Sequence, residues 1–112
     1  MKREQIEQLR QDIAVATTVC IHEPSVGCGH STGVAVYRHM DGWTFKLGTE
    51  GDVLKMMHRP APRRTHLIRL ASVTHIYLTY ESLFGKESPE IHWNVGKSER
   101  SVGKRYMIPL VL

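Results

Sequence analysis

Acidic residues are absent from a long central segment of this chain. Between Asp52 and Glu81 every charged side chain is basic, and histidines accompany the arginines and the lysine. A block of like charge repels itself unless an anion or a neighbouring carboxylate surface lies against it. The segment therefore indicates a binding function directed at an anionic partner. Its formal charges come from Lys55, Arg59, Arg63, Arg64 and Arg69.

Long apolar runs are also missing. No stretch approaches the roughly 20 apolar residues that a membrane-spanning helix needs. The N-terminal residues, which include Glu4 and Asp12, lack the apolar region of a secretory signal. We therefore expect a cytoplasmic protein without a membrane partner. Cysteine is scarce, and in the reducing cytosol Cys20 and Cys28 should remain thiols.

Aromatic residues make up only 7% of the 112 residues, which limits any surface on which nucleic-acid bases could stack. The hydrophobic share of 41% and the charged share of 23% are ordinary for a globular protein. A chain of this length predicts a single domain, residues 1–112. The net charge of +4 and the pI near 9.3 favour nucleic acid, nucleotides or an acidic protein surface as partners.

Hydrophobic spacing predicts an α+β fold that begins with a helix. An apolar stripe near the N-terminus recurs at helical spacing, and from Thr17 the period changes to that of a strand. Alternation along this strand places Cys20 and His22 on the face opposite Val19 and Ile21. The helical stripe consists of Ile6, Leu9, Ile13 and Ala16.

A hairpin is predicted for residues 34–47, with an Asp-Gly turn at residues 41–42. A two-residue type I′ turn suits this dipeptide because glycine adopts positive φ freely. In that register Val36 faces Leu47 across the hairpin, and Tyr37 lies on the opposite side.

Further elements complete the predicted fold, an N-terminal helix packed on a curved antiparallel sheet. A short internal helix begins at the acidic turn after Thr49 and ends before Pro60. The last strand contains Pro109, which lacks a backbone donor and therefore favours a sheet edge. The predicted strands comprise residues 65–70 and 76–80, joined by a bend near 71–72, then 91–95 and 108–112.

Cysteine and histidine alternate in two short motifs, Cys20-x-His22 and Cys28-x-His30. Thiolate and imidazole are zinc ligands, and two of each can form a closed structural site. Zinc is one interpretation, although zinc motifs usually space each pair by about two to four residues. The other is a buried free thiol at Cys20 and a loop cysteine at Cys28. Nucleophilic catalysis by Cys28 would need a base and an orienting group that the spacing does not supply.

A second basic segment follows Gly96 and contains one acid, Glu99. Its Gly-Lys-Ser sequence lacks the earlier glycine of a phosphate-binding P-loop. Backbone amides near Gly96 and Gly103 could instead form a looser anion-binding nest. The basic residues of this segment are Lys97, Arg100, Lys104 and Arg105.

The sequence thus predicts a non-enzymatic binding protein that captures a phosphate-bearing ligand, nucleic acid or a small nucleotide. One alternative is a small inhibitor or adaptor that binds an acidic protein with the same basic surface. Another is a zinc-stabilised interaction domain; otherwise no cofactor is expected. A homo-oligomer is expected through the N-terminal helix or the final strand. The predicted ligand-binding residues are Arg59, Arg63, Arg64, Arg69, Lys97, Arg100, Lys104 and Arg105.

Overall fold

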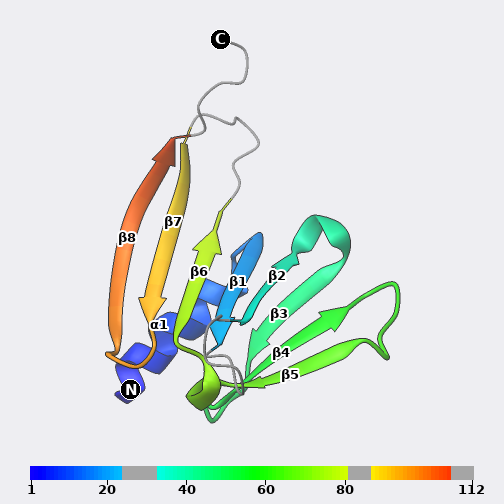
Figure 1. The fold of residues 1–112 in the computed structure, drawn as a ribbon, viewed down its shortest axis with the longest axis horizontal. Coiled ribbons are helices and arrows are strands. Elements are labelled where there is room, and N and C mark those ends of the chain that lie inside the picture. Colours follow the sequence, from blue (N-terminus) through cyan, green and yellow to red (C-terminus); the bar gives the residue numbers. More distant parts are fainter. Residues whose placement is uncertain (24–32, 81–86, 107–112) are drawn as a thin grey trace.

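Two antiparallel sheets and one helix enclose the core of this protein (Figure 1). The computed structural model describes residues 1–23, 33–80 and 87–106, and only the backbone of 87–89 and 104–106. The helix is α1 (Arg3–Ala14). The larger sheet has the order β2 (Gly33–Arg38), β1 (Thr18–Glu23), β6 (His75–Thr79), β7 (Glu87–Asn94) and β8 (Glu99–Tyr106). The smaller sheet has the order β3 (Trp43–Leu47), β4 (Val53–His58) and β5 (Thr65–Arg69).

The N-terminal helix forms where the apolar spacing predicts it. Leu9 and Ile13 are fully buried, and Ile6 packs at the edge of the same cluster. The first turn is closed by the Gln5 side chain, whose carbonyl accepts a hydrogen bond of 2.9 Å from the Lys2 backbone amide. The apolar stripe of α1 is therefore used within the chain's own core.

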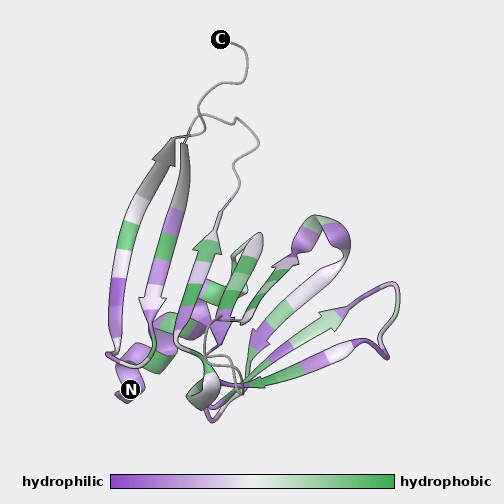
Figure 2. Ribbon diagram, viewed as in Figure 1, coloured by the Kyte–Doolittle hydropathy of each residue, from purple (hydrophilic) through white to green (hydrophobic). Residues whose placement is uncertain are grey.

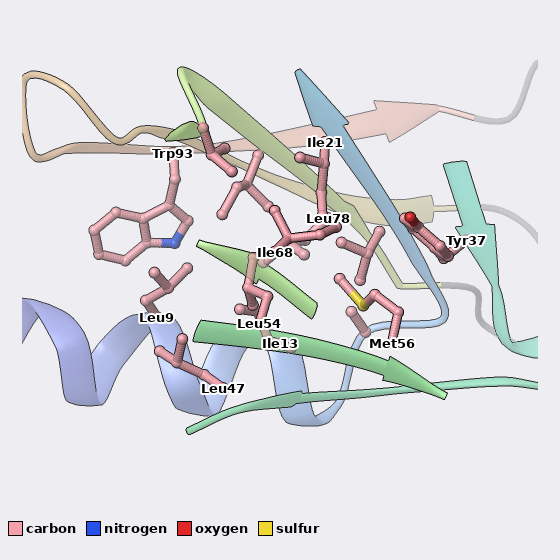
Figure 3. Close-up of a cluster of buried hydrophobic side chains, with 14 of the residues drawn as sticks. Leu9, Ile13, Ile21, Tyr37, Leu47, Leu54, Met56, Ile68, Leu78 and Trp93 are labelled. Atoms are coloured by element: carbon pink, nitrogen blue, oxygen red, sulfur yellow. The ribbon is translucent and has the colours of Figure 1, made fainter. Parts of the chain in front are cut away.

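The core lies between α1 and the inner faces of the two sheets (Figure 3). Figure 2 shows hydrophobic and hydrophilic residues alternating along the strands, as expected when one face of a sheet is buried. In β1 the prediction is confirmed: Val19 and Ile21 are fully buried, while Cys20 and His22 lie on the opposite face. Burying each large aliphatic side chain contributes about 1.5–3 kcal/mol to folding.

The predicted hairpin at residues 34–47 is wrong. Strand β2 pairs with β1, with Arg38 opposite Thr18, and β3 pairs with β4 in the other sheet. A 3-10 turn, η1 (His39–Asp41), connects β2 to β3, and it ends at Gly42, whose φ is 92°. The Asp-Gly signal therefore marks a chain reversal that leads from one sheet to the other. The faces of β2 are also inverted, since Tyr37 is buried and Val36 is exposed.

The short internal helix predicted before Pro60 does not form there, because Val53–His58 is strand β4. Its inner face carries the buried Leu54 and Met56, which alternate at strand spacing. The short helical turns are 3-10 turns, η1 and η2 (Leu70–Ser72), and η2 provides the bend expected between β5 and β6. The α+β class with an N-terminal helix on antiparallel sheets is confirmed, but two sheets replace the single curved one and neither is strongly curled in Figure 1.

The C-terminal part of the described chain differs from the prediction in one element. Residues 99–106, expected to connect two strands, form the edge strand β8. The final strand predicted for residues 108–112 lies outside the described residues. No helix within residues 1–23, 33–80 and 87–106 is long and apolar enough to cross a membrane.

Candidate functional site

Two of the five central basic residues, Lys55 and Arg69, lie on the outer face of the three-stranded sheet, and the other three lie in the connection between β4 and β5. The register places Lys46 directly opposite Lys55, and Leu67 follows on the next strand. Arg69 lies opposite Val53, one row further along the same face. The inner faces of β3 and β4 carry buried residues, so the alternate positions face away from the core. We call Lys46, Lys55 and Arg69 the basic sheet face.

A shallow groove of about 310 Å³ lies on this surface. Val53 and Leu67 contribute apolar lining, and the two lysines contribute the charge. Arg10 of α1 fixes the turn that forms one wall, because its guanidinium donates hydrogen bonds of 2.9 Å to the carbonyls of Gly48 and Thr49. The groove lining consists of Lys46, Gly48, Thr49, Val53, Lys55 and Leu67.

The charge of the basic sheet face is not balanced by an ion pair with any described carboxylate. Within the described ranges the ion pairs are those of Arg10 with Glu7 and of Arg100 with Asp12. Like charges on directly opposite strand residues destabilise a sheet, so the pairing of Lys46 with Lys55 has a folding cost. An anion bound between the two ammonium groups would remove that repulsion.

The connection between β4 and β5 adds three exposed arginines, Arg59, Arg63 and Arg64, which we call the basic loop. Its backbone is fixed at both ends. The Arg59 amide donates a hydrogen bond to the Gly42 carbonyl and the Arg64 amide donates one to the Ala61 carbonyl, and each hydrogen bond is 2.8 Å long. The guanidinium carbon of Arg64 lies 5.7 Å from the centre of the Trp43 ring, within cation–π range. Arg64 is therefore held against an aromatic side chain, whereas Arg59 and Arg63 extend from the surface.

The second basic segment does not join this surface. Figure 1 places the β7–β8 turn, which carries Lys97, on the opposite side of the molecule from the basic loop. Arg100 faces inward and pairs with Asp12, with 2.8 Å between its Nε and the carboxylate Oδ2. The side chains of Lys104 and Arg105 lie outside the described residues. Of the predicted ligand-binding residues, Arg59, Arg63 and Arg64 thus lie in the β4–β5 connection, and Arg69 lies at the other end of β5 on the outer face of the smaller sheet.

Asp12 is the buried centre of a polar network that the sequence did not predict. Its carboxylate accepts hydrogen bonds from Gln8 (2.9 Å), from the Trp93 indole (2.8 Å) and from two nitrogens of Arg100 (2.8 and 3.0 Å). The hydrogen bond to Asp12 raises the pKa of Arg100. Tyr80 donates to the Asp12 carbonyl, and burial raises the pKa of its phenol. This network joins α1 to the five-stranded sheet and has a structural role.

Only one of the two Cys-x-His pairs predicted to bind zinc lies within the described residues. The Cys20 sulfur lies 3.7 Å from the His22 Nε2, but Cys28 and His30 lie outside the described residues. In the described part of the chain, no three or more histidine, cysteine, aspartate or glutamate side chains are placed to hold one metal ion. Burial, followed by the charge of Glu90, raises the pKa of the Cys20 thiol, which disfavours the thiolate that a metal binds.

The outer face of the five-stranded sheet carries a cluster of imidazole and phenol rings, namely His22, His75, Tyr77 and His92. The Tyr77 and His92 rings stack with 4.3 Å between centres and an interplanar angle of 3°. The Nδ1 of His75 lies 3.0 Å from the Nε2 of His92. Burial and then the neighbouring His75 lower the pKa of His92, so its ring is mostly neutral at pH 7.

Comparison of the chain with protein families, curated proteins and solved structures finds no match. Function is therefore assigned from the chemistry of the described surfaces. The basic sheet face and the basic loop both carry positive charge that forms no ion pair with a described carboxylate.

Proposed function

We propose that this protein binds a phosphate-bearing ligand, nucleic acid or a phosphorylated nucleotide, through the basic sheet face and the basic loop. The observation that carries the proposal is the direct pairing of Lys46 with Lys55 beside a groove, with no described carboxylate in an ion pair with either. Two ammonium groups at opposed strand positions can contact one phosphate from both sides. The proposed role is binding without catalysis.

The extent of the basic surface favours a ligand with several phosphates. Arg59 follows Lys55 by four residues, which corresponds to roughly 13 Å along an extended strand. A mononucleotide in the groove would reach the lysines alone, whereas a nucleic-acid strand could contact the groove and the basic loop together. The exposed Leu67 and the half-buried Val53 offer an apolar surface for a sugar or the face of a base. Single-stranded nucleic acid is therefore the ligand that we favour.

The proposal is tested by fluorescence anisotropy with labelled single-stranded oligonucleotides of increasing length, in a salt series from about 50 to 200 mM. The affinity should fall linearly with salt on logarithmic axes, because binding releases counterions from the phosphates. A Lys46→Gln, Lys55→Gln variant should weaken binding and flatten the slope by about one unit for each lost phosphate contact. Lys97→Gln, which changes an exposed lysine in the β7–β8 turn, is the control. A salt-independent affinity, or equal loss in both variants, would refute the proposal.

An acidic protein partner is the second candidate, because Leu67 is 67% exposed within the basic surface. An exposed apolar residue ringed by charge is typical of protein interfaces as well as ligand grooves. The two candidates are separated by the same oligonucleotide series. Failure to bind any oligonucleotide or nucleotide at low salt, with retained binding of an acidic protein probe such as a poly-glutamate chain, would favour the protein partner.

A further inference from the structure

Three histidines lie on three adjacent strands of the five-stranded sheet, on the face opposite the core. His22 is on β1, His75 on β6 and His92 on β7. The register places His22 directly opposite His75, whereas His92 lies opposite Tyr77 and diagonally from His75. All three side chains are half-buried. Sequence spacing cannot show this arrangement, because the three residues come together only through strand pairing.

The donor atoms of two of these rings face each other. His75 Nδ1 and His92 Nε2 are 3.0 Å apart. In a tetrahedral zinc site with nitrogen ligands at about 2.0–2.1 Å, two ligand nitrogens lie roughly 3.4 Å apart. Opening the pair by a few tenths of an ångström would therefore admit a metal ion between the two lone pairs. Without a metal, the same contact is a hydrogen bond in which one ring donates and the other accepts.

Tyr77 packs against His92 of this pair and against the neighbouring His22. Its ring stacks on His92 at 4.3 Å and contacts His22 at 4.9 Å, between ring centres. Packing of this kind restricts the side-chain rotamers of the imidazoles, as supporting residues do around metal ligands. The Nε2 of His22 instead lies 3.7 Å from the Cys20 sulfur, and no three donors of the described residues converge on one point.

We propose that His75 and His92 bind a divalent transition-metal ion of the zinc type on the outer face of the five-stranded sheet. His22 is the candidate third ligand, because its ring centre lies 6.3 Å from that of His75 and a side-chain rotation would bring a nitrogen to the ion. Neutral imidazole is a preferred ligand of this class of metal. The site lies apart from the basic sheet face and does not depend on the proposed function.

This site differs from the one predicted by the two Cys-x-His motifs. That site would use Cys20, His22, Cys28 and His30, so the two hypotheses share at most His22. Substitutions at His75 and His92 therefore affect one site, and substitutions at Cys28 and His30 affect the other.

The test is zinc affinity of the full chain, measured by competition with a chromophoric chelator after removal of bound metal. The wild type should bind one zinc ion, and a His75→Ala, His92→Ala variant should lose at least tenfold in affinity. The Cys28→Ser, His30→Ala variant should bind as the wild type does, and His39→Ala, an exposed histidine elsewhere, is the matched control. Circular dichroism verifies that each variant is folded.

Ring resonances give a second readout that needs no substitution. In NMR spectra of the wild type, substoichiometric zinc should perturb the imidazole signals of His75 and His92 before those of His39. Undiminished affinity in the His75→Ala, His92→Ala variant would overturn the proposal. So would loss of affinity in the Cys28→Ser, His30→Ala variant, or ring signals of His75 and His92 that do not respond to zinc.

Discussion

Replacing Lys46 by glutamate should stabilise the fold and weaken binding of phosphate ligands. In the wild type Lys46 and Lys55 occupy directly opposite positions on β3 and β4, where Cβ atoms lie about 5 Å apart. Two unit charges at about 6 Å in bulk water interact with about 0.7 kcal/mol. The substitution converts this repulsion into an attraction. After the cost of ordering two long side chains, a net gain of about 0.5–1 kcal/mol is expected at low salt.

Thermal unfolding measures the gain, which corresponds to a rise in Tm of a few degrees for a domain of this size. Lys46→Gln should give about half the rise, because it removes the repulsion without adding an attraction. The difference between variants should shrink at about 1 M salt, where the screening length is about 3 Å. Oligonucleotide affinity of the same samples should be highest for the wild type, lower for Lys46→Gln and lowest for Lys46→Glu. A Lys46→Glu variant that is less stable than the wild type would refute the inferred pairing.

Three further outcomes follow from the described contacts. Asp12→Ala should lower the free energy of unfolding by about 3 kcal/mol, measured with urea, because it leaves the Arg100 charge and an indole donor without their partner. The pKa of His92 is lower in the folded chain than in the unfolded one, so unfolding takes up a proton. Stability should therefore be complete above about pH 6.5, fall as the pH drops from there toward the lowered pKa and level off below it, and His92→Asn should reduce that loss in chelator-containing buffer. The sequence predicted a homo-oligomer through the N-terminal helix or the final strand, but the apolar stripe of α1 is buried in the core, so the exposed Val34 and Val36 of the edge strand β2 are the surface that we propose in its place. If a homo-oligomer forms there, light scattering should show the mass return to a monomer on Val34→Thr, Val36→Thr substitution.

The parts of the fold that could be predicted from the sequence are those that depend on local periodicity. The α1 stripe and the faces of β1 repeat at spacings that burial imposes on neighbouring residues. The hairpin at residues 34–47 was wrong because pairing is decided by distant strands: β2 finds β1, and β3 finds β4. In β4, the helix-favouring residues of Leu-Lys-Met-Met concealed a strand whose signal was the alternation of Leu54 and Met56.

The candidate site was predicted only in part, because some of its residues are consecutive in the chain and others meet only through strand pairing. The acid-free segment contains most of the basic surface, since β4, β5 and their connection are consecutive in the chain. Lys46 was missed because it precedes that segment and reaches Lys55 only through the register of β3 with β4. Arg100 was expected to contact ligand, yet it pairs with Asp12, a partner 88 residues away that no local pattern reveals.

The separation of the two surfaces provides an internal control for both proposals. The basic sheet face lies on the smaller sheet and the imidazole cluster on the outer face of the larger one, with the shared core between their inner faces. A substitution that only damages folding should weaken oligonucleotide and zinc binding together. Lys46→Gln, Lys55→Gln should instead leave zinc affinity unchanged, and His75→Ala, His92→Ala should leave oligonucleotide affinity unchanged. Coupled losses in both assays would show that one of the two surfaces acts only through the stability of the core that they share.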